Sequence, residues 1–329
     1  MSKHYAVISV GTNSTRALLA DVAPAVPHVV LARAIGTRIG EGLGESGKLA
    51  DEPIVRTLEA IRQLQRAVRG RYVRLFAVAT SALRRAENGE EFLERAREIL
   101  GVPVRVLGGD EEAAASYRGA VSALGGMRGE RVGVLDVGGG STEFAAGTTI
   151  VPERVVSCEI GAVRLTEAIP ALAGRDGAVD AATIERARQA ARQALEPLSD
   201  GEPVERAAFV GGSATTAASI ARGRKGTIAA YSLSREDLQR ELGRLCALSL
   251  DERKAVTGML SQRADILPAG IVVLDTALEL LGLDAALATT SDLLLGVLLE
   301  QRDAAAPTAG QPRPRRAGSE SQRGNRHGQ

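Results

Sequence analysis

The chain contains the same strand–turn–strand pattern twice, and this repeat restricts the fold more than any other feature of the sequence. Residues 4–10 form an apolar run of strand length, a turn of small residues follows at 11–14, and another strand is predicted after it. The pattern starts again at 131–137, with a glycine-rich turn at 138–141. A length of 329 residues also suits two domains better than one core. We therefore predict two lobes of related architecture.

The segments around these repeats alternate between strand and helix patterns, which is typical of an α/β protein. In residues 52–69, for example, apolar side chains recur every three or four positions, as on one buried face of a helix. Further strands are predicted at 15–22, 28–36, 73–79, 103–107, 142–148, 151–157 and 206–210, and further helices at about 89–100, 110–124, 180–196, 213–222, 234–246, 263–282 and 291–302.

Gly125, Gly126 and Gly129 break the pattern before the second strand–turn–strand unit, and this break predicts where the domains meet. Residues 1–124 are expected to form the first lobe and residues 126–303 the second, each built on a mixed five-stranded sheet. The last helix, about 291–303, is expected to pack back on the first lobe. Residues 304–329 are rich in Pro, Gly, Ser and Arg and contain almost no large apolar residues. We therefore predict that they form a disordered basic tail.

The charge balance and the scarcity of histidine and cysteine disfavour several classes of function. Lys and Arg number 41 against 40 Asp and Glu, so the net charge of +1 favours neither nucleic acid nor a membrane as a partner. No signal peptide or apolar run of spanning length occurs, and the two cysteines form no CxxC pair, which predicts a cytoplasmic protein. None of the three histidines lies beside a likely nucleophile, which disfavours a Ser-His-Asp triad.

The segment from Asp136 to Glu143 carries the strongest chemical signal. Three glycines allow backbone N–H groups to turn toward one anion, two hydroxyl groups add donors, and an acid stands on each side of the turn. Such a hairpin suits phosphate and Mg²⁺ together. The plainer alternative is a glycine turn between two solvated acids. The predicted phosphate-binding residues here are Gly138, Gly139, Gly140, Ser141 and Thr142.

Two other turns have a similar composition. The opening turn is expected to face the glycine-rich turn across a cleft, with Gly11, Thr12, Asn13 and Ser14 binding phosphate, although Asn-Ser turns are common in proteins. Gly212 and Ser213 begin a predicted helix directly after a strand, so their N–H groups suit a second phosphate. An ordinary Ser/Thr helix cap explains this third segment nearly as well.

The segments GTNSTR, ATSALRRAENG, GGDEEA and DVGGGSTE occur in this order. Together they resemble the exopolyphosphatase / guanosine pentaphosphate phosphohydrolase family, part of the actin, sugar kinase and Hsp70 superfamily. The resemblance extends over nearly the whole ordered chain. It implies an α/β fold of two ribonuclease-H-like (actin-like) domains, with phosphates bound in an interdomain active-site cleft and water as the nucleophile.

The resemblance also implies roles for single residues. Asp136 would help to position Mg²⁺, Glu143 would bind the metal or orient water, Glu112 would be the general base, and Arg84 would bind phosphate. Neighbouring acids would raise the pKa of Glu112, whereas the helix N-terminus would lower it. Without the resemblance, the acids at 110–112 read as ordinary first-turn residues of a helix.

One position departs from the family pattern. Ser9 stands where the family usually has Asp, and its hydroxyl brings no charge for Mg²⁺. We predict an exopolyphosphatase that acts on inorganic polyphosphate, with a preference for short chains. The alternatives are a guanosine pentaphosphate hydrolase, a weakly catalytic sensor of polyphosphate or nucleotide and, with less support, a kinase-like phosphotransferase. The oligomeric state stays open, with a homodimer among the alternatives.

Overall fold

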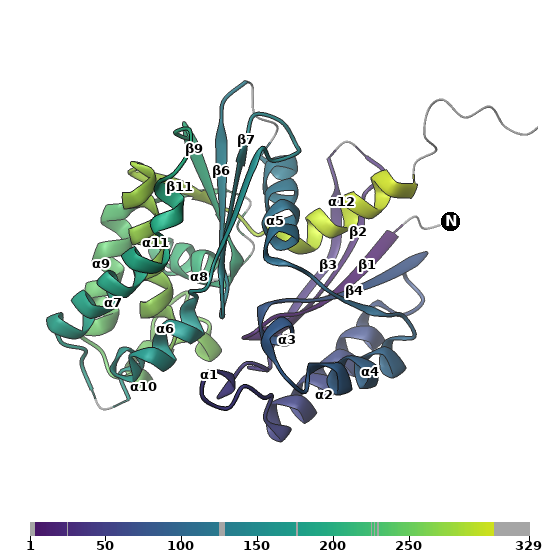
Figure 1. The fold of residues 1–329 in the computed structure, drawn as a ribbon, viewed down its shortest axis with the longest axis horizontal. Helices are drawn as coiled ribbons and strands as arrows, with labels where there is room; N and C mark the ends of the chain where they lie inside the picture. Colours follow the sequence, from purple (N-terminus) through teal and green to yellow (C-terminus); the bar gives the residue numbers. More distant parts are fainter. Residues whose placement is uncertain are drawn as a thin grey trace, which may run out of the picture.

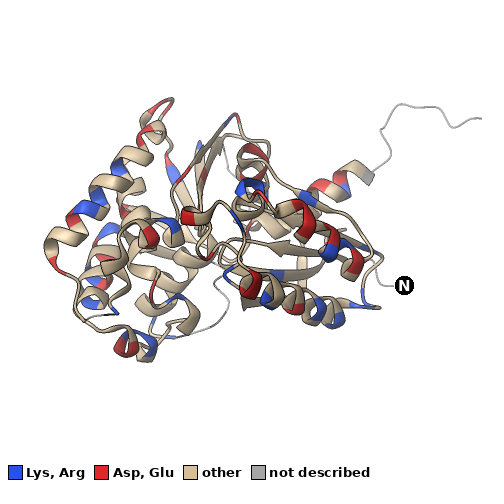
Figure 2. Cartoon of the chain, turned by 60° about the horizontal axis from the view of Figure 1, so that its bottom comes forward, with Lys and Arg blue, Asp and Glu red and all other residues tan. Residues whose placement is uncertain are grey.

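A computed structural model describes residues 4–305, apart from residues 25, 125–128, 176, 225, 227 and 229. The described chain folds into two α/β lobes, each organised around its own sheet (Figure 1). Lys, Arg, Asp and Glu are interspersed along the outer helices of both lobes (Figure 2). No helix among the described residues is long and apolar enough to cross a membrane.

The first lobe contains a five-stranded sheet, as predicted, and its strands run in the order β3-β2-β1-β4-β5. Strands β1, β2 and β3 form an antiparallel meander, and β4 and β5 continue the sheet parallel to β1. Apolar side chains of this sheet pack against α2 and α4 on one face. The elements are β1 (His4–Val10), β2 (Ser14–Asp21), β3 (His28–Gly36), α1 (Leu43–Ser46), α2 (Asp51–Val68), β4 (Arg74–Ala79), α3 (Ser81–Arg85), α4 (Gly89–Leu100) and β5 (Val104–Val106).

The second lobe repeats this arrangement with one more strand. Its sheet runs β10-β11-β9-β6-β7-β8, so the prediction of five strands is wrong for this lobe. Strand β10 forms the edge of this sheet and pairs antiparallel with β11. Both are four residues long, too short for alternation to distinguish them from a helix or a loop. The strands are β6 (Val132–Val137), β7 (Thr142–Gly147), β8 (Arg154–Cys158), β9 (Arg206–Val210), β10 (Tyr231–Ser234) and β11 (Ala285–Ala288).

The helices of the second lobe gather around α11, which is buried along most of its length. It contacts α6, α7, α8 and α9, and its composition of Leu, Ile, Val and Ala fits a helix surrounded by protein. The helices are α6 (Ala162–Ala168), α7 (Ala181–Ala194), α8 (Gly211–Ala221), α9 (Arg235–Cys246), α10 (Leu250–Ala255) and α11 (Leu267–Leu281), with 3₁₀ turns at Pro170–Ala173, Glu196–Ser199 and Ser261–Arg263.

Helices α5 (Gly109–Ala123) and α12 (Leu293–Ala305) pack against each other between the two sheets (Figure 1). Their crossing is close, because a Cβ at Gly119 would collide with the backbone of α12 and one at Gly296 with the backbone of α5. Helix α5 packs on the second sheet, whereas α12 packs on β1 and β2 of the first. The predicted boundary after residue 124 assigns α5 to the first lobe, although α5 also packs on the sheet of the second lobe. The position of this boundary stays a prediction. Residues 304 and 305 belong to α12, and the rest of the predicted tail lies outside the described residues.

Candidate active site

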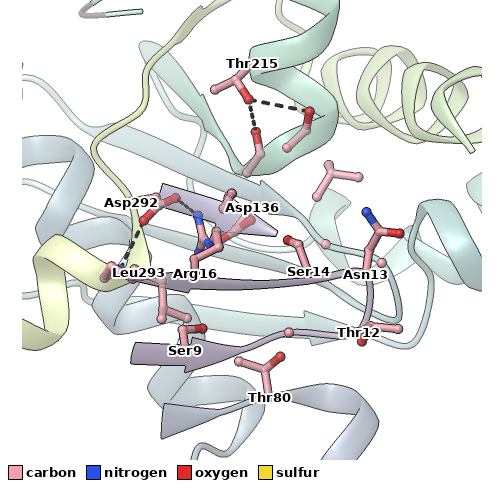
Figure 3. A pocket seen from close by; sticks show the side chains of 18 of the residues that line it. Ser9, Thr12, Asn13, Ser14, Arg16, Thr80, Asp136, Thr215, Asp292 and Leu293 are labelled. Carbon is pink, nitrogen blue, oxygen red and sulfur yellow. Dashed lines mark hydrogen bonds and ion pairs between the residues drawn. The ribbon is translucent and has the colours of Figure 1, made fainter. Parts of the chain in front are cut away.

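The two glycine-containing turns meet at a cavity between the lobes. Strands β1 and β4 end on one side of this cavity, and β6 and β9 end on the other, so the carboxyl ends of parallel strands from both sheets face it. Ligands of open α/β sheets bind at such ends. The cavity has a volume of about 300 Å³. Its lining includes residues 11–14 and 138–141, as the sequence predicted. Figure 3 shows Thr12, Asn13 and Ser14 among the residues of this lining.

Both turns are closed by the same hydrogen bond. The Gly11 N–H donates to the Ser14 carbonyl at 3.0 Å, and the Gly138 N–H donates to the Ser141 carbonyl at 3.1 Å. The turns also approach the opposite wall closely. A Cβ on Gly140 would lie 2.8 Å from Ser81 Oγ, which explains why glycine is needed there. The narrow gap brings backbone N–H groups of both lobes within reach of one phosphate chain.

Glu112 lies in the first part of α5 and is only 5% exposed. Arg84 Nη1 donates to Glu112 Oε1 at 2.5 Å and to the Leu107 carbonyl at 2.7 Å. Burial raises the pKa of Glu112 to about 7, with a further contribution from Asp136 and Glu159, while Arg84 opposes the rise. The neighbouring acids of the helix, expected to raise this pKa, are not its cause. Arg84 does not line the cavity. It contacts the site through its hydrogen bond to Glu112, which does line the cavity.

Asp136 and Glu143 stand opposite each other on β6 and β7 and both line the cavity. Ser116 Oγ donates to Asp136 at 2.7 Å, and Ser157 Oγ donates to Glu143 at 3.3 Å. Burial is the main cause that raises the pKa of each acid. Asp292 adds to the rise at Asp136, and Glu112 and Asp136 add to it at Glu143. The second lobe therefore presents buried carboxyl groups that repel one another.

These carboxyl groups fit a hard divalent cation, which would offset their repulsion and prefers oxygen ligands. No group of three or more His, Cys, Asp or Glu side chains in the described part of the chain is arranged to hold a metal ion by itself. Mg²⁺ is commonly held by one or two carboxylates together with substrate phosphates and water. Asp136 and Glu143 match that pattern of incomplete protein coordination.

Three residues of this site were not assigned a role from the sequence. Arg16 lines the cavity opposite Ser9 on the neighbouring strand and forms an ion pair with Asp292, which precedes α12. Arg263 also lines the cavity, and burial followed by repulsion from Arg16 and Arg38 lowers the pKa of Arg263 to about 10. Arg16 lies inside the segment GTNSTR, whereas Arg263 and Asp292 lie outside the four segments that carry the family resemblance.

Two predicted phosphate ligands do not line the cavity. Thr142 is buried, and its hydroxyl donates to the Ile160 carbonyl at 2.7 Å. Successive side chains of a strand point to opposite faces, so Thr142 points away from the face that presents Glu143. Ser213 is also buried, against Gly270 of α11. Gly212 does line the cavity, together with Gly211 and Thr215 at the start of α8.

Comparisons with known proteins agree with one another. The Ppx/GppA phosphatase family profile matches residues 18–303. Exopolyphosphatase 2 of Mycobacterium tuberculosis is 35% identical over 318 residues, covering 89% of this chain and 97% of that protein. A guanosine-5'-triphosphate,3'-diphosphate pyrophosphatase of Vibrio parahaemolyticus is 30% identical over 307 residues, covering 91% of this chain and 59% of that protein.

A solved structure gives the same result for the fold. The PPX-GPPA enzyme of Aquifex aeolicus aligns with a TM-score of 0.75 at 27% identity, covering 91% of this chain and 99% of that chain. The predicted fold class, two ribonuclease-H-like (actin-like) domains around an interdomain cleft, is confirmed by this likeness.

Proposed function

This chain belongs to the Ppx/GppA phosphatase family, a family of hydrolases that act on phosphoanhydride bonds, and we propose that it is an exopolyphosphatase. Its substrate is inorganic polyphosphate, from which it removes the terminal phosphate. The observation that carries this proposal is Glu112, a buried carboxyl group whose pKa is raised to about 7 and which lines a cavity together with the turns at 11–14 and 138–141. A general base works best when its pKa lies near the working pH.

The proposed reaction begins with a water molecule beside Glu112. The water oxygen forms a bond to the terminal phosphorus, and a water proton passes to the Glu112 carboxylate. The bridging P–O bond breaks, and its electron pair leaves with the shortened chain as the new terminal oxygen. Arg84 keeps Glu112 oriented and favours its ionised form, since the guanidinium donates directly to the carboxylate.

The substrate is held mainly by backbone N–H groups and arginine. The turns at 11–14 and 138–141 and the start of α8 at Gly212 surround the phosphates, while Arg16 and Arg263 supply positive charge. Phosphatases of this family generally need a divalent metal ion, and we propose Mg²⁺ at Asp136 and Glu143. When bound, the ion would neutralise charge on the substrate phosphates.

Two features support polyphosphate over guanosine pentaphosphate. The exopolyphosphatase relative is matched over 97% of its length and the guanosine relative over 59%. None of the described residues that line the cavity is aromatic, so the cavity has no ring on which a purine can stack.

The two buried cysteines, unpaired in the structure, support a reducing compartment such as the cytoplasm as the place of action.

The test is phosphate release from polyphosphates of defined length and from guanosine pentaphosphate, each with Mg²⁺ and with a chelator. We expect release from polyphosphate that requires Mg²⁺ and is fastest with short chains. Release only from guanosine pentaphosphate would favour the second candidate, which the Vibrio relative supports. Tight binding of either substrate without any release would instead support the sensor suggested by Ser9.

A further inference from the structure

The wall of the cavity around Ser9 contains a partly buried ion pair that the proposed reaction does not explain. Ser9 on β1 and Arg16 on β2 are cross-strand neighbours, so their side chains share one face of the sheet. Ser9 cannot neutralise the guanidinium beside it. Asp292 does so instead, although 276 residues separate it from Arg16 in the sequence.

Asp292 is held in place from two sides. One carboxylate oxygen forms the ion pair with Arg16, and the other accepts a hydrogen bond from the Leu294 N–H at 3.0 Å, at the start of α12. The side chain is 9% exposed, and α12 is fixed against β1 and β2 by apolar contacts. The carboxylate therefore has little freedom, and Arg16 is held by a rigid partner.

The direction of Arg16 matters because Asp136 lies on its other side. Figure 3 shows the guanidinium between Asp292 and Asp136, above Ser9 and inside the cavity. A guanidinium offers five N–H donors, so pairing with one aspartate leaves donors for a phosphate oxygen. An unpaired arginine in this position would be free to fold onto Asp136 and block that carboxylate.

We propose that Asp292 is a positioning residue: from the start of α12 it supplies the negative charge that β1 lacks at Ser9, and it thereby presents Arg16 to the substrate phosphates. This inference rests on the proposed function for its substrate. According to this inference, one carboxylate is needed beside Arg16. It can stand at residue 292 or at residue 9, but it is not needed at both.

Moving the charge tests this inference. Asp292→Asn keeps the oxygen that caps Leu294 and removes the charge, and we expect KM for polyphosphate and the dissociation constant for inorganic phosphate to rise about tenfold, on the scale of one charge-assisted hydrogen bond. Ser9→Asp alone adds a second acid beside Asp136 and is expected to weaken phosphate binding through repulsion. The double variant Ser9→Asp/Asp292→Asn restores one carboxylate and should bind within about twofold of the wild type.

The matched control is Asp303→Asn, which removes an exposed, ion-paired aspartate from the same helix. It should leave KM and phosphate binding unchanged. A double variant that binds phosphate as weakly as Asp292→Asn would overturn the inference, and so would a wild-type protein that does not bind inorganic phosphate. Phosphate binding needs no turnover, so a protein without exopolyphosphatase activity would refute the proposed function while the binding measurements still decided the role of Asp292.

Removing both charges distinguishes an ion pair that positions Arg16 for phosphate binding from one that only stabilises the fold. Arg16→Gln/Asp292→Asn leaves no uncompensated buried charge and is expected to fold, as thermal unfolding would check. Our inference predicts that this neutral pair keeps its unfolding midpoint near that of the wild type yet loses about tenfold in phosphate affinity. Wild-type affinity in the neutral pair would show that the two residues only stabilise the fold.

Discussion

The two strand–turn–strand units carry different charges at matching positions. In the second lobe, Asp136 stands two residues before the turn and pairs across the strands with Glu143. In the first lobe, the same positions hold Ser9 and Arg16. Both turns nevertheless close with the same Gly-to-Ser hydrogen bond. The repeated backbone therefore forms one pocket, while the side chains make one wall acidic and the other basic.

This difference assigns separate tasks to the two walls. The acidic wall, with Asp136 and Glu143 near Glu112, suits a metal ion and a proton acceptor. The basic wall, with Arg16, suits the phosphate oxygens of the substrate, and Arg263 of the second lobe, which lies against Gly212, adds a second guanidinium. A polyanion bound between them contacts opposite charge on one side and, on the other, acids whose repulsion a cation relieves. Substitutions on the two walls should therefore affect kcat and KM differently.

The largest effect is expected from Glu112→Gln, which changes the proton acceptor and little else. Glutamine keeps the size of the side chain and an oxygen for Arg84, so phosphate binding should stay nearly unchanged. We expect kcat to fall by about a hundredfold or more, or about 2.7 kcal/mol of activation free energy. The control is Glu111→Gln, since Glu111 only caps the Gly108 N–H on the same helix. Unchanged turnover would remove Glu112 from the mechanism.

A smaller effect is expected where the two walls touch. In Gly140→Ala the new methyl group would meet Ser81 Oγ at 2.8 Å and Thr12 Oγ1 at 3.0 Å, so these side chains or the turn itself must shift. We expect KM for polyphosphate to rise about tenfold, because fewer N–H groups reach the same phosphate. The same substitution at Gly243, where no atom lies within 4 Å of the added methyl group, provides the control. Steady-state kinetics at saturating Mg²⁺ would show whether the close approach matters.

The smallest expected change is a shift of the pH profile. Glu112 must be ionised to accept a proton, and its pKa is about 7, so kcat/KM should fall as the pH drops through about 7. Arg84 lowers the pKa of Glu112, and Arg84→Gln should therefore move the acidic limb to higher pH. The pH dependence of kcat/KM for both proteins measures this. A shift to lower pH, or none, would mean that another group controls the limb.

Short, contiguous motifs allowed much of the site to be predicted from the sequence. Residues 136–143 form a strand, a turn and a second strand, so Asp136 and Glu143 are brought together by local hydrogen bonds alone. The internal repeat similarly predicted the strand–turn–strand unit that opens each lobe. The features of the site that could be predicted are those formed by residues close together in the sequence.

The remaining features depend on contacts between distant segments. Arg16 meets Asp292, and Arg38 meets Asp265 across 227 residues, only because the lobes and α12 pack as they do. The cause of the raised pKa of Glu112 was missed for the same reason. Asp110 and Glu111 are adjacent in sequence, but burial comes from packing, and Asp136 and Glu159 approach from other elements. Neither the periodicity nor the spacing of residues in the sequence indicates such contacts.

In the proposed reaction, water attacks the terminal phosphorus of a polyphosphate chain held between the two walls. Running the reaction with short polyphosphate and Mg²⁺ in water labelled with heavy oxygen, and measuring the label in both products by mass spectrometry, would show which atom water attacks. We predict one labelled oxygen in each released phosphate and none in the shortened chain. Label in the shortened chain, or release of unlabelled phosphate, would show that water does not attack the terminal phosphorus.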